Sequence, residues 1–105
     1  INRKSDKRAG ESMSDTEQQF WDLTEELIET ANQKAAEQDP AVISDAMLYA
    51  AARFGAYTAA ITTAARKEFK EDMAEIKAML MQQFEAMLDS NLADYLENYK
   101  IYLDR

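Results

Sequence analysis

A single arginine in a long uncharged stretch is the residue of this sequence best suited to binding chemistry. Arg53 is the only charged side chain between Asp45 and Arg66. Tyr49 and Tyr57 lie four residues before and after it, which places all three side chains on one face of a helix. A guanidinium flanked by hydroxyl groups can bind a carboxylate or another anion. The pattern therefore leaves two alternatives, which are a binding site for an acidic ligand or partner and an internal salt bridge that fixes helix register.

Catalytic and metal chemistry have few candidate groups. The chain contains no histidine and no cysteine, so the commonest general base and the commonest transition-metal ligands are missing. A carboxylate-bridged di-metal bundle needs Glu-x-x-His motifs, and two glycines cannot build a phosphate-binding loop. We expect no catalytic residue, no metal, no cofactor and no enzymatic activity. A carboxylate-only enzyme is the weakest of the alternatives.

The composition is typical of an all-helical protein. The chain has 105 residues, enough for one domain, with only two glycines and one proline to form turns. Ala, Glu, Leu, Met, Gln and Lys, which favour helices, are plentiful. The absence of cysteine gives no sign of an oxidising compartment, so we expect a cytoplasmic protein.

The charge is unevenly distributed along the chain. Residues 1–12 are polar and carry four basic side chains, and we expect them to be a disordered extension or a cloning remnant, with Met13 as the natural start of a single domain over 13–105. Residues 13–105 contain 18 acidic and 8 basic side chains, a net charge of −10. Such a surface repels nucleic acid and anionic membranes, so neither is an expected partner.

Helix start and stop signals divide the chain. Ser14 and Glu17 have the spacing of a capping box, and Asp39 before Pro40 is typical of a new helix start. Two adjacent threonines and a rise in charge indicate a third boundary. The predicted fold is an antiparallel bundle of three long helices, the last one continuous or broken near residues 89–91. The predicted helices span about residues 16–37, 41–62, 66–89 and 91–103.

The second predicted helix carries two apolar stripes, so we expect it to be the central, buried helix. A heptad-like seam consists of Ile43, Met47, Ala50, Phe54, Tyr57, Ile61 and Ala64. A flanking stripe of smaller residues contains Leu48, Ala51 or Ala52, Gly55 and Ala59, which would let another helix approach closely. A membrane span over 46–65 is the rejected alternative, because Arg53 near its centre would cost roughly 2.5–3.5 kcal/mol to insert.

The third predicted helix offers a face for self-association. If it extends beyond its neighbours, its uncovered apolar side chains need a second chain, and a symmetric dimer is the commonest solution. Methionines on this face could instead form an adaptable groove for an unidentified protein partner, or simply fill a core. The candidate interface residues are Met73, Ile76, Met79, Leu80, Phe84 and Met87.

Two segments and an aromatic pair resemble a known family. The segments are LYAAARFGAY at residues 48–57 and MLDSNLADYLENY at residues 87–99, and the pair is Phe20 and Trp21. Together they resemble a family of short, all-helical bacterial proteins catalogued as a domain of unknown function, over roughly residues 16–103. The resemblance implies a bacterial, cytosolic, helical protein and supplies no activity, cofactor or catalytic residue.

Three hypotheses about function follow, in order of preference. The first is a helical interaction or scaffold protein that acts as a homodimer. The second is a binding module for an acidic ligand or a partner's carboxylate, centred on Arg53. The third is the carboxylate-only enzyme.

Overall fold

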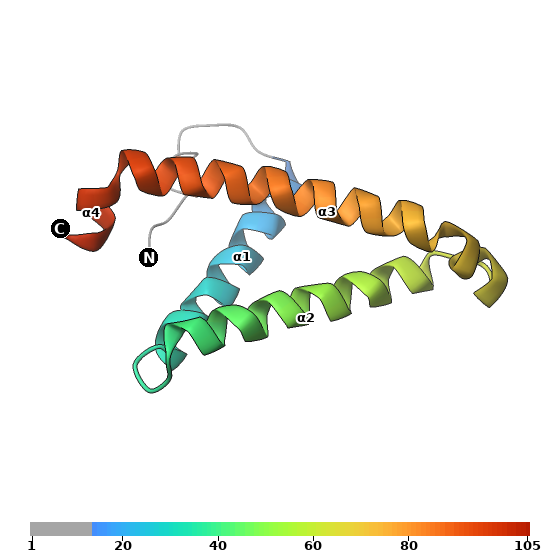
Figure 1. Cartoon of the computed structure of the whole chain (residues 1–105), viewed down its shortest axis with the longest axis horizontal. Coiled ribbons are helices and arrows are strands. Elements are labelled where there is room, and N and C mark those ends of the chain that lie inside the picture. The colour runs from blue at the N-terminus through green and yellow to red at the C-terminus, as the bar shows by residue number, and fades with distance from the viewer. Residues whose placement is uncertain (1–13) are drawn as a thin grey trace. The chain divides into compact units, whose positions relative to one another are not determined.

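A computed structural model describes residues 14–105, and every regular element in this range is a helix (Figure 1). The prediction of an all-α protein is confirmed. The expectations for residues 1–12 and for Met13 lie outside the described residues. The helices are α1 (Asp15–Lys34), α2 (Pro40–Ile61), α3 (Arg66–Glu97) and α4 (Tyr99–Leu103).

The predicted start of α1 is confirmed in atomic detail. The backbone N–H of Glu17 donates to Oγ of Ser14 at 3.1 Å, and the backbone N–H of Ser14 donates to Oε1 of Glu17, also at 3.1 Å. This capping box satisfies two backbone donors that the first turn leaves without a helical partner. The helix ends at Lys34, a few residues earlier than predicted, and a turn over residues 35–37 follows.

Asp39 and Pro40 begin α2 as the sequence indicated. The backbone N–H of Ala41 donates to Oδ1 of Asp39 at 2.9 Å, while the ring of Pro40 occupies the first helical position, where no N–H is needed. The helix ends at Ile61, where the hydroxyl groups of Thr62 and Thr63 donate back to carbonyls one turn earlier. These bonds compete with the helical pattern and explain a boundary without glycine or proline.

Of the two alternatives for the third helix, continuous or broken near residues 89–91, the structure has the continuous one in this segment. α3 runs without interruption through this segment to Glu97. The amide of Asn91 donates to the carbonyl oxygen of Met87 at 2.7 Å, so a side chain expected to cap a new helix instead bonds within the existing one. The chain does break before α4, but at Asn98, whose backbone leaves helical geometry (φ −110°, ψ 25°).

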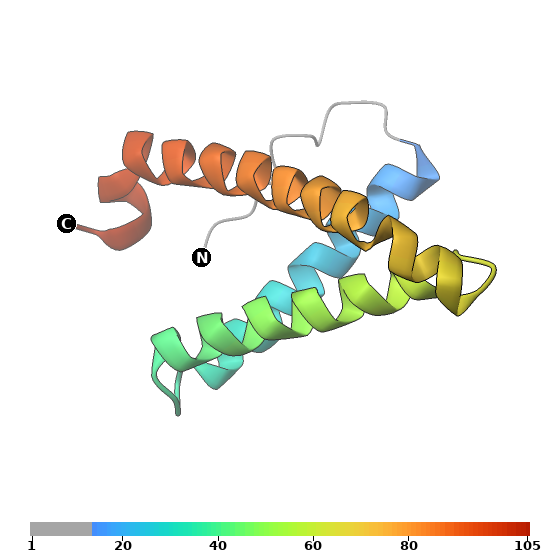
Figure 2. The same cartoon turned by 45° about the vertical axis from the view of Figure 1, so that its right-hand side comes forward.

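The chain divides into two compact units, at residues 46 and 47 within α2. The described part of the first unit contains α1 and the first turns of α2. The second contains the rest of α2, α3 and α4. Within the second unit, residues 62–65 connect α2 to α3, and the two helices diverge from this connection in both views (Figures 1 and 2). The predicted single domain and three-helix bundle stay predictions.

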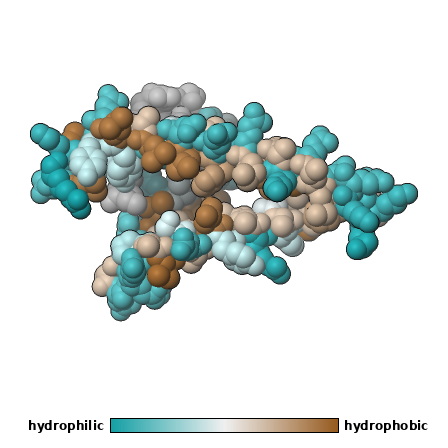
Figure 3. All heavy atoms as spheres, viewed as in Figure 1, coloured by the Kyte–Doolittle hydropathy of each residue, from teal (hydrophilic) through white to brown (hydrophobic). Residues whose placement is uncertain are grey.

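No apolar side chain in residues 14–105 is buried. In particular, α2 contains no buried residue, and the expectation of a buried central helix stays a prediction. Figure 3 shows apolar side chains exposed along α2 and α3, with hydrophilic ones gathered around their connection.

Candidate functional site

The face of α2 that looks toward α3 is formed by small residues. Gly55 and Ala59 are less exposed than their neighbours, and they lie four residues apart on one side of the helix. A Cβ atom placed on Gly55 would lie 3.5 Å from Cδ1 of Leu80, so the end of the Leu80 side chain reaches α2 at this point. Of the predicted flanking stripe, Gly55 therefore faces a side chain of α3.

The opposite side of α2 carries an apolar stripe that no helix of the second unit covers. We call Met47, Ala50, Phe54, Tyr57 and Ile61 the α2 seam. The exposed fractions of its large side chains are 38% for Met47, 66% for Phe54, 56% for Tyr57 and 61% for Ile61. The rings of Phe54 and Tyr57 lie 5.6 Å apart at a tilt of 44°, which forms an aromatic pair at the middle of the seam.

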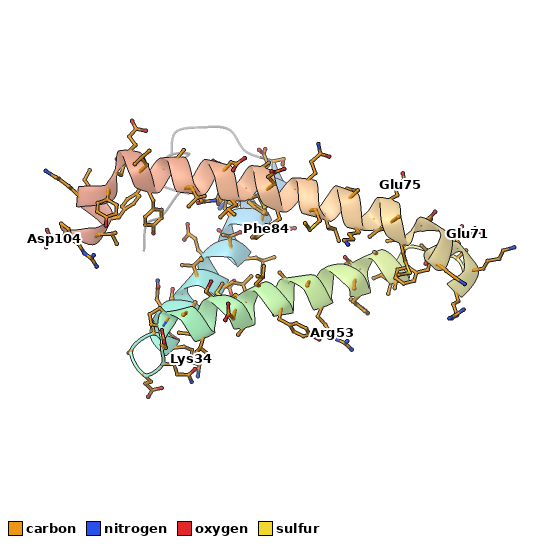
Figure 4. The ribbon with its side chains drawn as sticks, viewed as in Figure 1. Lys34, Arg53, Glu71, Glu75, Phe84 and Asp104 are labelled. Carbon is orange, nitrogen blue, oxygen red and sulfur yellow. The ribbon has the colours of Figure 1, made fainter. Side chains whose placement is uncertain are left out.

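Arg53 lies beside this seam and is exposed. Its side chain points away from α3 in Figure 4. Tyr49 is also exposed, by 68%, so the three residues predicted to form a binding site share an open face of α2. No ion pair joins Arg53 to another residue of 14–105. Within the second unit the guanidinium is therefore accessible, and both alternatives for Arg53 stay predictions.

The candidate interface residues of α3 fall into two groups. Ile76 and Leu80 are partly covered on the side where Leu80 meets Gly55. The other four are about half exposed: Met73 at 53%, Met79 at 54%, Phe84 at 50% and Met87 at 52%. The structure therefore brings Leu80 against α2, leaves Ile76 partly covered and leaves the other four open.

The C-terminal end of α3 holds a polar cluster that sequence reasoning missed. Asp94 is the only buried residue among 14–105, with 8% exposure. Its Oδ1 accepts from the amide of Asn98 at 3.1 Å, and its Oδ2 accepts from the hydroxyl of Tyr102 at 3.0 Å. The ring of Tyr102 also contacts that of Tyr95, with centroids 4.8 Å apart.

This cluster fixes α4 against the end of α3. The signal was present as Asp, Asn and Tyr at spacings of four, but such residues also occur on ordinary solvated helix faces. Only the backbone break at Asn98 turns Tyr102 back toward Asp94, and that break has no distinctive local sequence. Because the hydrogen bonds of Asp94 are made to neighbours in its own chain, the cluster is structural.

The described residues were also compared with the requirements of a metal site and of a membrane-spanning helix. Within residues 14–105, no three acidic side chains gather in a way that could hold a metal ion. The carboxylates of Glu71 and Glu75 extend from α3 as separate side chains in Figure 4. None of the helices of 14–105 combines the length and apolar character needed to cross a bilayer.

The helices and their open faces define an all-helical protein with exposed apolar side chains along α2 and α3. The chain belongs to the family described as "Protein of unknown function (DUF3144)", whose model matches residues 20–96. This match confirms the resemblance seen in the sequence. No curated protein and no solved structure gave a significant match to the chain.

Proposed function

We propose that this protein is a helical interaction or scaffold module that acts by self-association. The observation that carries the proposal is the absence of any buried apolar side chain in residues 14–105. Burial of apolar surface is the main favourable term in folding, and a chain of this size normally has a core of its own. Burial of the apolar side chains that stay exposed along α2 and α3 would stabilise the protein, and association with a second copy buries them.

The helical spacing of the exposed apolar side chains supports this assignment over a solvated monomer. Isolated apolar residues on a surface are ordinary, but contiguous apolar patches mark interfaces. Here the exposed residues recur at helical spacing along the α2 seam and along α3, as they do where helices pack against partners.

The test is the mass of the full chain in solution, measured by size-exclusion chromatography with light scattering at micromolar concentration. We expect a dimer, with twice the 12.0 kDa of one chain. A monomer that stays folded at this concentration contradicts the proposal. The variant Met79→Glu tests whether α3 forms the interface, because it should then lower the measured mass to that of one chain. Met79 is suited to this test since it is exposed and, unlike Leu80, does not contact Gly55.

A second candidate function is binding of an acidic ligand or a partner's carboxylate by Arg53, with Tyr49 and Tyr57 as additional donors. The accessibility of the guanidinium favours it, because an arginine committed to an internal salt bridge could not receive an external anion. Binding of acetyl-capped glutamate peptides to the native chain and to Arg53→Met, followed by calorimetry, tests it. Equal heats for the two proteins would exclude the site.

A further inference from the structure

The α2 seam and the α3-facing side of α2 are separate surfaces of one helix. Successive residues of a helix are rotated by about 100°, so Phe54 and Tyr57 lie far around the helix from Gly55. The contact with Leu80 uses the Gly55 side. The α2–α3 contact at Gly55 therefore does not use the seam.

The seam is also the surface on which two copies of this acidic chain would repel each other least. α2 carries one acidic and one basic side chain, a net charge of zero. α1 carries six acidic and one basic side chain, and α3 carries eight and four, so their net charges are −5 and −4. Like charges across an interface oppose association. Pairing α2 with α2 avoids this penalty, whereas pairing α1 with α1 or α3 with α3 does not.

We infer that a second copy of the chain covers the α2 seam with its own α2, and that the two helices run antiparallel with the twofold axis beside residue 52. This inference rests on the self-association proposed above and names the helix and the register through which it occurs.

The register follows from the order of large and small residues along the seam. An antiparallel pair with its axis beside residue 52 sets Phe54 opposite Ala50 of the second copy, and Met47 opposite Tyr57. The bulky ring of Phe54 thus faces the smallest residue of the seam, as interdigitated helix packing requires. The axis also lies close to the middle of Pro40–Ile61, so most of each helix is overlapped.

Arg53 is compatible with this pairing. It is not a seam residue, and it neighbours Tyr57 and Tyr49 on the helix surface at a spacing of four. Its charged group therefore sits at the edge of the pair, where water can solvate it while its methylene groups cover the apolar contact. The dimer does not bury an unpaired charge.

Cysteine cross-linking of the full chain tests the register directly, because the native sequence contains no cysteine. In the antiparallel dimer of the double variant M47C/Y57C, the cysteine at position 47 of each copy lies opposite the cysteine at position 57 of the other, so two disulfides can form. Within one chain the two positions are about 15 Å apart along the rigid helix, beyond the reach of a disulfide. The single variants M47C and Y57C are the matched controls, since each thiol would lie about 15 Å along the helix from its symmetry mate.

The expected result is a covalent dimer on oxidation of the double variant and no more than background dimer from either single variant. Cross-linking of the single variants would show a parallel pair and overturn the inference. A non-covalent dimer that none of the three variants cross-links would also overturn it, while leaving self-association intact. If light scattering shows that the native chain is a folded monomer, both this inference and the proposed function fail. A monomer in which another helix of the same chain covers the seam would give this result.

Discussion

Asp94 joins the end of α3 to α4 through side chains spaced four residues apart. Tyr102 contributes in two ways, since its hydroxyl donates to Asp94 and its ring packs on Tyr95. A five-residue helix is too short to be stable by itself, so these contacts determine whether α4 forms.

Replacing Tyr102 with phenylalanine should lower the free energy of unfolding by about 1 kcal/mol, because it removes one hydrogen bond to a buried carboxylate and keeps the ring contact. Urea denaturation followed by circular dichroism measures the change. Tyr99→Phe is the control, since the hydroxyl of Tyr99 forms no hydrogen bond with the described residues, and it should leave the unfolding midpoint unchanged. Equal effects of the two variants would contradict the assigned role of Tyr102.

Arg53→Met is expected to leave the fold intact. Arg53 is exposed and joins no ion pair within residues 14–105, so the substitution should change the free energy of unfolding by no more than about 0.5 kcal/mol. Loss of one partner from a buried salt bridge would instead cost about 3–5 kcal/mol. A thermal melt of the variant separates these values, and a large loss of stability would restore the internal-bridge interpretation.

At the scale of elements, the α2–α3 contact depends on the small size of Gly55. Gly55→Ala should be tolerated or should raise the free energy of unfolding by up to about 1 kcal/mol, since its Cβ would meet Leu80 at an ordinary contact distance of 3.5 Å and alanine favours helices. Gly55→Leu should lower stability, because a larger side chain must push α3 away. Urea denaturation of both variants checks the order, and a Gly55→Leu variant as stable as Gly55→Ala would contradict the contact.

Helix starts were predictable because their signals are local. A capping box at Ser14 and Glu17, or an Asp39–Pro40 pair, acts through neighbouring backbone groups, and both predictions were confirmed. The sequence offered a continuous and a broken helix near Asn91 without choosing between them, and the break at Asn98 was not predicted, because an asparagine can bond either inside a helix or at its end. The Arg53 site was predictable as a spacing on one helix face, but its exposure depends on which helices cover α2.

At the scale of the whole molecule, the charge and the exposed apolar faces act against each other. Residues 13–105 have a net charge of −10, which opposes association at long range, while apolar contact favours it at short range. Salt screens the first term and leaves the second largely unchanged. The dissociation constant of the dimer should therefore fall as sodium chloride is raised from about 0.05 to about 0.5 M. This increase shortens the Debye length roughly threefold, so the repulsion between the two acidic chains weakens. Sedimentation equilibrium measures it, and a dimer that weakens with salt would indicate an interface held by ion pairs.

Folding and association should be coupled, because the described chain has no apolar core of its own. Phe54→Glu places a charge in the α2 seam and removes the burial of one aromatic side chain, worth about 1.5–3 kcal/mol, so the dissociation constant should rise at least tenfold. Ala56→Glu is the matched control, since Ala56 is exposed on the same helix but lies outside the seam. We expect Phe54→Glu to be monomeric and to lose helical ellipticity at micromolar concentration, whereas Ala56→Glu stays a dimer. If the monomer formed by Phe54→Glu were as helical and as stable as the native chain, apolar burial within one chain would suffice for folding, and the second copy would serve another purpose.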